Sequence, residues 1–129
     1  MSAVLLDTHA WAWSLTGYER LSKTAASAIL QAESVYVSPI SFYEIGQKVR
    51  FGKWPQMETY VTQLQSLLQR QGGMVSTLSS EICLRAATLE WTHRDPFDRL
   101  LAATAQDQGI PIVSADVAFD SVAGVTRLW

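Results

Sequence analysis

The sequence predicts an α/β fold, in which helices cover both faces of a central parallel sheet of about four to five short strands. Short, continuously apolar runs recur along the chain, as is typical of parallel strands that are buried on both faces. Longer stretches with helical spacing separate these runs, so strands and helices alternate. The chain has 129 residues, of which 48% are hydrophobic, and this fits a single domain over residues 1–129.

The first strand is expected at residues 3–6, which read Ala-Val-Leu-Leu. Asp7 follows this strand directly, and its side chain can cap a helix that starts near His9. Residues 21–32 have helical spacing behind a serine, which predicts a second helix. The apolar run Val-Tyr-Val at residues 35–37 predicts the second strand.

A Ser-Pro pair after the second strand is a helix-start signal, and the helix that it opens should run through Glu44. We expect this helix to fray over residues 51–55, which contain a glycine and a proline. Apolar residues then trace one helical face, which predicts a continuous helix over residues 57–68. Gly72 and Gly73 end that helix.

The last part of the chain supplies three more strands and two more helices. A third strand is expected at residues 74–78, and a helix follows at residues 79–89. An Asp-Pro pair opens another helix, which Gly109 closes. The fourth strand is expected at residues 111–114 and a fifth at residues 125–129.

Four acidic residues stand where one expected element ends and the next begins: Asp7, Glu44, Asp98 and Asp116. In an open parallel sheet, ligands bind outside the carboxyl ends of the strands, at the edge from which these helices leave. The four side chains could therefore face one crevice. Carboxylates are hard oxygen ligands that suit Mg²⁺ or Mn²⁺, so the set predicts a metal site that positions phosphate oxygens.

Each of these acids also has a purely structural interpretation. Asp7 and Asp116 fit helix N-caps, because Asp accepts hydrogen bonds from free backbone N–H groups. The segments Ser-Phe-Tyr-Glu44 and Asp95-Pro-Phe-Asp98 both have the spacing of a capping box. Asp95 is the better cap of its pair and Asp98 the better ligand. A cap is favoured for any one acid taken alone, but four caps need not point into one crevice.

The basic residues suggest a phosphate-binding surface beside the acids. The net charge is −2, which by itself argues against a polyanion as partner. Without the four acids, however, 12 − 4 = 8 acids remain against 10 bases, a formal charge of +2. Lys48, Arg50 and Lys53 form the densest basic group, and with Arg99 they are the candidates for binding substrate phosphates. The alternative for the dense group is a solvated helix end.

A few other residues could join a metal site. Asp120 lies one helical turn after the last of the four acids, so it is a possible outer ligand. His9 and His93 have no partner histidine at metal-ligand spacing, so no zinc site is expected, although either could hydrogen-bond near the acids. Cys83 is the only cysteine, which excludes an intramolecular disulfide and a thiolate cluster, and we expect it in the core.

The tryptophans and the apolar runs bear on partners and location. The five tryptophans show no repeated basic–aromatic pattern, so they are expected in the core or at an interface, with Trp11, Trp13 and Trp54 available to a protein partner. No apolar run approaches the roughly 20 residues that span a bilayer, and no leader-like segment opens the sequence. We therefore expect a cytoplasmic protein without membrane contact.

The order and spacing of four motifs identify a family resemblance. The motifs lie at residues 5–9, 37–45, 93–105 and 112–116, and together they resemble those of the PIN-domain nucleases, within them the VapC-like toxins of bacterial toxin–antitoxin pairs. The resemblance covers essentially the whole chain. Tyr43 stands where relatives often carry Trp, which affects only local packing.

The resemblance implies a PIN-like fold with Mg²⁺ or Mn²⁺ bound by Asp7, Glu44, Asp98 and Asp116. Asp98 matches the family's acid rather than Asp95, because it precedes Leu-Leu-Ala-Ala at the family's spacing. The implied activity is hydrolysis of phosphodiester bonds in cellular RNA, with metal-activated water as the nucleophile. The implied partners are the RNA substrate, a cognate VapB-like antitoxin and a second copy of the chain in a homodimer.

Two other functions fit parts of the sequence. A haloacid-dehalogenase-like phosphohydrolase also begins with a buried strand that ends in a catalytic Asp. That family has a second Asp two residues later, whereas this chain has His9. A non-catalytic module with the same fold could instead bind only a protein partner, although a complete set of acids argues against it.

Overall fold

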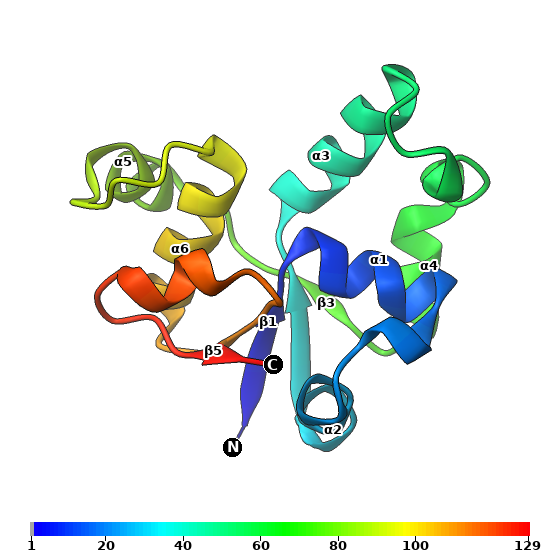
Figure 1. The fold of residues 1–129 in the computed structure, drawn as a ribbon, viewed down its shortest axis with the longest axis horizontal. Coiled ribbons are helices and arrows are strands. Elements are labelled where there is room, and N and C mark those ends of the chain that lie inside the picture. Colours follow the sequence, from blue (N-terminus) through cyan, green and yellow to red (C-terminus); the bar gives the residue numbers. More distant parts are fainter. Residues whose placement is uncertain (1) are drawn as a thin grey trace.

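The computed structural model describes residues 2–129 as an α/β structure built on five parallel strands (Figure 1). The strand order is β3-β2-β1-β4-β5, so the first strand of the chain lies in the middle of the sheet. Each pair of neighbouring strands is parallel, as the sequence predicted. The strands are β1 (Ala3–Leu6), β2 (Ser34–Val37), β3 (Met74–Val75), β4 (Ile112–Val113) and β5 (Arg127–Leu128).

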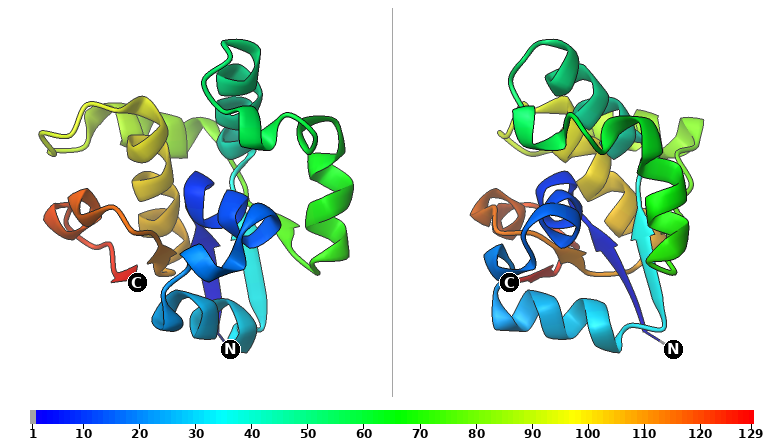
Figure 2. Two further views of the ribbon diagram at one scale, coloured as in Figure 1. Left: turned by 45° about the vertical axis from the view of Figure 1, so that its right-hand side comes forward. Right: turned by 90° about the vertical axis from the view of Figure 1, so that its right-hand side faces the viewer.

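Within the same residues, six α-helices and four short 3₁₀ helices connect the strands. The α-helices are α1 (Thr8–Thr16), α2 (Lys23–Gln31), α3 (Pro39–Arg50), α4 (Leu64–Arg70), α5 (Ser80–Thr88) and α6 (Pro96–Gln108). The 3₁₀ helices are η1 (Tyr18–Arg20), η2 (Pro55–Met57), η3 (Val61–Gln63) and η4 (Val117–Ser121). Two further views show α2 along one end of the sheet and α3 rising from the opposite end (Figure 2).

Side chains of the central strand alternate between two apolar clusters, one on each face of the sheet. Val4 and Leu6 pack with residues of α1, α2, α3 and α4, whereas Leu5 packs with residues of α6 and η4. Leu5 has no exposed surface, and Leu6 is only 2% exposed. A strand covered on both faces has no polar side, which explains the continuous apolar run in the sequence.

The predicted continuous helix over residues 57–68 is wrong. This segment consists of η2, η3 and the short helix α4, joined by turns. Met57 and Leu64 are both buried in the same cluster, so the apolar spacing reflects packing against one core rather than one helix. The intervening run Thr-Tyr-Val-Thr is rich in β-branched residues with low helix propensity, which favours the break.

Two other predictions need correction. The third strand covers only Met74–Val75 instead of residues 74–78, and both residues are exposed because β3 lies at the sheet edge. Cys83 is exposed on α5, whereas its neighbour Ile82 is fully buried, because successive residues of a helix point in different directions. In residues 2–129 no helix has the length and apolarity that crossing a membrane would require.

Candidate metal centre

The carboxyl ends of β1 and β4 lie side by side and carry two of the four acids. Asp7 follows β1 and caps α1, and Asp116 lies beyond β4 and caps η4. Glu44 lies in the second turn of α3, and Asp98 lies in the first turn of α6. Because α3 starts directly after β2, which pairs with β1, its first turns leave the sheet at the same edge.

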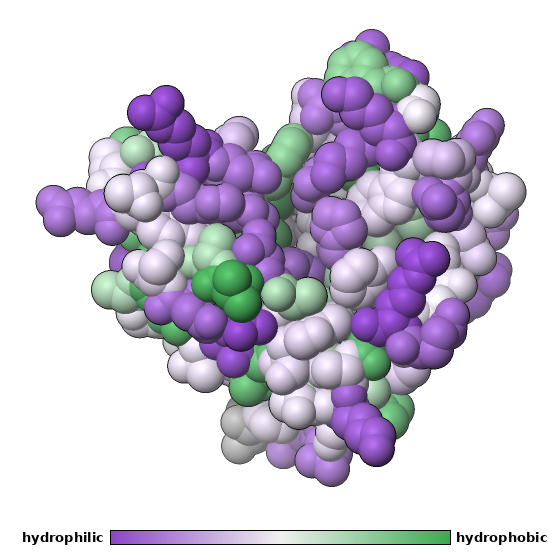
Figure 3. Space-filling model, in the orientation of Figure 1, coloured by the Kyte–Doolittle hydropathy of each residue, from purple (hydrophilic) through white to green (hydrophobic). Residues whose placement is uncertain are grey.

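The four acids line one cleft with a volume of about 310 Å³. The space-filling view shows a hollow between the part of the molecule that carries α6 and the part that carries α3 (Figure 3). Its other lining residues are Thr8, His9, Trp13, Lys48, Asp95 and Ala115. The structure therefore brings together all four acids that the sequence identified as candidates.

The cap and the ligand interpretations are both compatible with the geometry of Asp7 and Asp116. Oδ1 of Asp7 accepts a hydrogen bond from the Ala10 N–H at 2.7 Å, and Oδ1 of Asp116 accepts one from the Ala118 N–H at 2.9 Å. A carboxylate has two oxygens and several lone pairs, so a cap leaves acceptor capacity for a cation. The caps also fix the orientation of both carboxylates in the cleft.

The two helix-borne acids do not act as caps. Ser38 rather than Ser41 caps α3, with its Oγ accepting from the Ile40 N–H at 3.1 Å, so the predicted capping box ending at Glu44 is wrong. Asp95 caps α6, which leaves Asp98 free to point into the cleft. This confirms the assignment of Asp95 as the cap.

Burial of the acids makes their negative charge unfavourable. Asp7 is only 7% exposed, and burial together with the charges of Asp98 and Glu44 raises its pKa to about 6. The pKa of Asp98 is also raised, chiefly by burial, although a hydrogen bond from His93 opposes that shift. A cation bound in the cleft would offset both effects, because it stabilises the charged carboxylates.

Glu44 has a positive partner within the cleft. Lys48 Nζ lies 2.8 Å from Glu44 Oε2, one helical turn along α3, and Glu44 is only 6% exposed. The Lys48 ammonium also lies 5.5 Å from the centre of the Trp54 ring. Lys48 therefore neutralises one buried acid and places a cation on the cleft wall.

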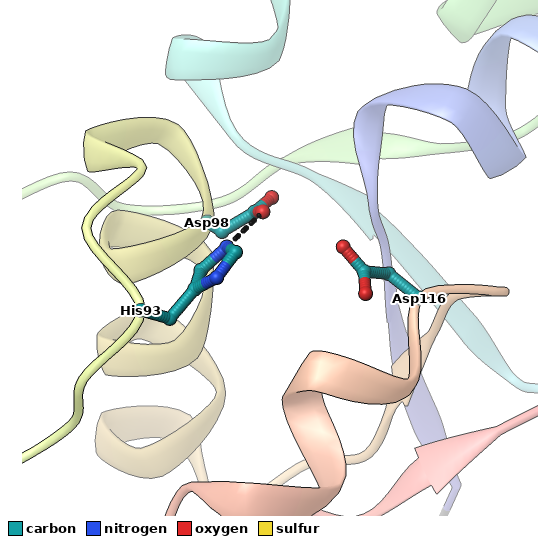
Figure 4. Close-up of side chains that lie close together, drawn as sticks. All are labelled: His93, Asp98 and Asp116. Atoms are coloured by element: carbon teal, nitrogen blue, oxygen red, sulfur yellow. Dashed lines mark hydrogen bonds and ion pairs between the residues drawn. The ribbon is translucent and has the colours of Figure 1, made fainter.

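His93 reaches the acids from the loop before α6. Its Nε2 atom lies 2.7 Å from Oδ2 of Asp98, and Figure 4 shows both side chains directed toward Asp116. One ligand atom from each of these three residues lies within 4.8 Å of the others. The expected hydrogen bond near the acids is present, but nothing in the sequence indicated which acid the ring would contact.

Arg99 does not line the cleft. Its guanidinium group donates hydrogen bonds of 2.6 to 2.9 Å to the backbone carbonyls of Ala86, Leu89, Trp91 and His93. These bonds tie the end of α5 and the following loop to α6. Because its donors are used internally, the prediction that Arg99 binds substrate phosphate has no support in this geometry.

Asp120 also lies outside the cleft lining. Its two carboxylate oxygens accept hydrogen bonds from the Arg127 guanidinium at 3.0 and 3.1 Å, and this pairing lowers the pKa of Asp120. The pair connects η4 with β5. The outer-ligand role predicted for Asp120 therefore has no support in the structure.

Aromatic rings form one wall of the cleft. The His9 ring lies 4.8 Å from the Trp54 ring and 5.8 Å from the Trp13 ring, and Trp129 packs behind Trp13 at 5.7 Å. Both His9 and Trp13 line the cleft. Trp11, by contrast, is fully buried and cannot meet a partner, so its predicted availability is wrong.

The donor set fits a divalent cation. Among the described residues, five carboxylates line the cleft, the four candidate acids and Asp95, together with a single lysine. Hard oxygen donors of this kind are the preferred ligands of Mg²⁺ and Mn²⁺. Asp7 is almost completely buried and has no basic side chain as an ion-pair partner among the described residues, which is costly for a charged carboxylate. The residues present are thus suited to holding such an ion.

Comparison with known proteins identifies the family of the chain. The family model of the PIN domain matches residues 4–125. The chain belongs to the PIN domain family. A relative named ribonuclease VapC22, from Mycobacterium tuberculosis, is 29% identical over 119 residues, which is 90% of this chain and 88% of that protein.

Solved structures show the same PIN fold at lower identity. The structure of VapBC2 from Rickettsia felis bound to a promoter DNA fragment has a TM-score of 0.68 at 14% identity and covers 97% of this chain and 96% of its own. DNA-bound VapBC from Salmonella typhimurium also has a TM-score of 0.68 at 14% identity, covering 98% and 97%. VapBC-1 from nontypeable Haemophilus influenzae has a TM-score of 0.67 at 17% identity, covering 97% and 96%.

Proposed function

We propose that this chain is a metal-dependent endoribonuclease that acts as the toxin of a toxin–antitoxin pair, with residues 1–129 as one nuclease domain. The observation that carries the proposal is the convergence of four acids on one cleft at the carboxyl edge of a parallel sheet. Membership of the PIN domain family, the name of the relative ribonuclease VapC22 and the VapBC structures support it. The same family membership disfavours the dehalogenase alternative.

In this proposal Asp7, Glu44, Asp98 and Asp116 hold Mg²⁺ or Mn²⁺. Such an ion would activate water and stabilise negative charge on the attacking and leaving oxygens of the phosphodiester. The protein fixes the geometry: backbone N–H groups orient Asp7 and Asp116, and the loop before α6 presents His93 to Asp98. Lys48 pairs with Glu44 in the metal-free cleft. Once a cation neutralises Glu44, the Lys48 ammonium would be released from this pair and could bind a substrate phosphate instead.

The substrate is proposed to be a single-stranded segment of RNA. Lys48 lies in the last turn of α3 and lines the cleft. Arg50 ends the same helix and Lys53 follows it, and in this proposal the three residues together bind the phosphate backbone. Trp13 and His9 on the cleft wall offer aromatic faces for an unpaired base, which a duplex could not present. An accessible loop of a folded RNA would satisfy both requirements.

The proposed experiment is a cleavage assay on total cellular RNA with the purified chain. We expect cleavage with Mg²⁺ or Mn²⁺ and none with chelator, and loss of activity in Asp98→Asn. Asp120→Asn is a matched control, because Asp120 is an acid outside the cleft lining, and this variant should retain activity. Cleavage that persists in chelator would reject the metal chemistry, and absence of cleavage of any RNA would favour a non-catalytic binding module.

The proposed partners are a VapB-like antitoxin and a second copy of the chain, all in the cytoplasm. The VapBC structures support a complex of this kind. The acidic cleft suggests that the antitoxin inserts a basic side chain among the carboxylates. Co-expression with the neighbouring gene should give an inactive complex of defined stoichiometry by light scattering, whereas a freely active chain that is harmless to cells would contradict the toxin assignment.

A further inference from the structure

The His93 imidazole lies beside two of the four acids. Its Nε2 atom is 2.7 Å from Asp98 Oδ2, and one ligand atom each from His93, Asp98 and Asp116 lies within 4.8 Å of the others. Figure 4 shows the three side chains around one space between α6 and η4. Ligands bound at about 2.0 to 2.6 Å from one ion lie at most about 4 to 5 Å apart, so small side-chain movements suffice.

The ring is held in this position from two sides. Its face packs on Trp91 with 4.8 Å between ring centres, and the Trp91 indole N–H donates to Ser121 Oγ at 2.9 Å. The His93 backbone carbonyl accepts a hydrogen bond from Arg99 at 2.9 Å. Side chain and backbone are therefore both fixed before any ligand binds, as a preorganised site requires.

We propose that His93 is a nitrogen ligand of the ion held by Asp98 and Asp116, and that it makes the centre prefer a first-row transition-metal ion over Mg²⁺. This inference rests on the proposed function, since it concerns the same centre. Imidazole suits Fe, Ni, Cu and Zn ions best, and Mn²⁺ accepts it less strongly, whereas Mg²⁺ favours an all-oxygen shell. A mixed shell of one imidazole and several carboxylates discriminates between these ions in a way that four carboxylates alone do not.

The main alternative is that His93 only orients Asp98 through their hydrogen bond. His93→Gln separates the two roles, because a glutamine amide can still donate to the Asp98 carboxylate but offers no imidazole nitrogen. His9→Gln is the matched control. His9 is a second cleft-lining imidazole, but it packs against Trp54 and lies outside the three-residue cluster.

The experiment uses Mn²⁺ as the probe with tag-free protein and no RNA. Pulsed electron paramagnetic resonance of bound Mn²⁺ should show coupling to an imidazole ¹⁴N nucleus in the wild type and in His9→Gln, but not in His93→Gln. Calorimetry should show that His93→Gln weakens Mn²⁺ binding by about tenfold or more, a loss of the size seen when even an outer-shell partner is removed. The Mg²⁺ affinity of His93→Gln should fall by a smaller factor than its Mn²⁺ affinity.

Three outcomes would overturn the inference: no ¹⁴N coupling in the wild type, coupling that persists in His93→Gln, or equal weakening of Mn²⁺ and Mg²⁺ binding in that variant. Equal weakening would assign His93 the positioning role. If coupling is absent while Mn²⁺-dependent RNA cleavage persists, the ligand assignment fails and the proposed function stands. If the wild type binds neither metal, both fail.

Discussion

At the scale of single residues, Asp7 shows how burial prepares a carboxylate for a cation. It is 7% exposed, and its pKa is raised to about 6 by burial and by the neighbouring acids Asp98 and Glu44. The charged form is therefore disfavoured until a metal ion compensates for it. The same carboxylate caps α1 by accepting a hydrogen bond from the Ala10 N–H. An asparagine at this position can accept the same bond but carries no charge.

This predicts a pH dependence of the metal-free protein. Between about pH 4 and 6 the folded state keeps a proton on Asp7 that the unfolded state has lost, so the free energy of unfolding should fall as pH rises through this window. A shift in pKa from 3.8 to about 6 corresponds to at most about 3 kcal/mol. Urea unfolding in chelator would measure the slope, and Asp7→Asn should flatten it. An unchanged slope in that variant would show that Asp7 does not titrate in this range.

A second prediction concerns Asp98, the acid that His93 contacts. Asp98→Asn should reduce RNA cleavage by more than about 100-fold, beyond the loss expected for an outer-shell partner. Its metal-free melting temperature should stay the same or rise, because one of several repelling charges is gone. Adding Mg²⁺ at about 100 times its Kd should stabilise the wild type by about 2.7 kcal/mol and the variant much less. Thermal melts with and without Mg²⁺ test this, and an equal gain in both would exclude Asp98 as a ligand.

At the scale of elements, the connection between α5 and α6 depends on one side chain. Arg99 donates to four backbone carbonyls of α5 and of the loop that presents His93 to the cleft. Carbonyl groups after a helix end otherwise need water or other donors. A planar guanidinium with five N–H groups can satisfy several of them at once, and a lysine cannot.

We therefore expect Arg99→Lys to lower the free energy of unfolding by about 2 kcal/mol, since hydrogen bonds from a charged group are lost. Cleavage should also fall, because the loop that holds His93 loosens, whereas RNA binding in chelator should be unaffected. Arg94→Lys in the same loop is the matched control, because Arg94 is exposed. Chemical denaturation and RNA-binding assays measure these effects. Weaker RNA binding by Arg99→Lys would instead indicate that Arg99 contacts phosphate.

The end of α3 supplies the test of the phosphate-binding surface. Exchanging Arg50 and Lys53 for alanine should weaken RNA binding in chelator. It should also make the plot of log binding constant against log salt concentration less steep, by about 0.7 for each phosphate that is no longer neutralised. Lys23→Ala is the control, because it removes an exposed positive charge on α2, at the opposite end of the sheet (Figure 2). Binding measured at several salt concentrations gives the slope. An equal change in the control would mean that net charge, not this surface, governs affinity.

At the scale of the whole molecule, the sheet order determines where the site lies. The first strand is central, with β2 on one side and β4 on the other, so the carboxyl ends of three strands meet at one edge. Residues as distant in sequence as Asp7 and Asp116 become neighbours of one cleft because these two strands pair. The two clusters of apolar side chains on opposite faces hold the sheet, and with it this edge, in place.

Much of this could be predicted from the sequence because it depends on local signals. The buried strand at residues 3–6 follows from a continuous apolar run, and the helix ending at Gly109 follows from Asp-Pro at its start and a left-handed glycine with φ of 64° at its end. The positions of Asp7 and Asp116 at the ends of strands follow from the same signals. These patterns depend on a few neighbouring residues, so no knowledge of the rest of the chain is needed.

Only the tertiary structure decided which of these residues act together. Cys83 faces solvent although cysteine is usually buried, and the segment over residues 57–68 breaks because each piece packs separately on the core. Arg99 binds carbonyls rather than lining the cleft, and His93 joins Asp98, because the loop before α6 folds back over that helix. Interactions of this kind depend on the strand order and on the path of a loop, which no local pattern of residues specifies.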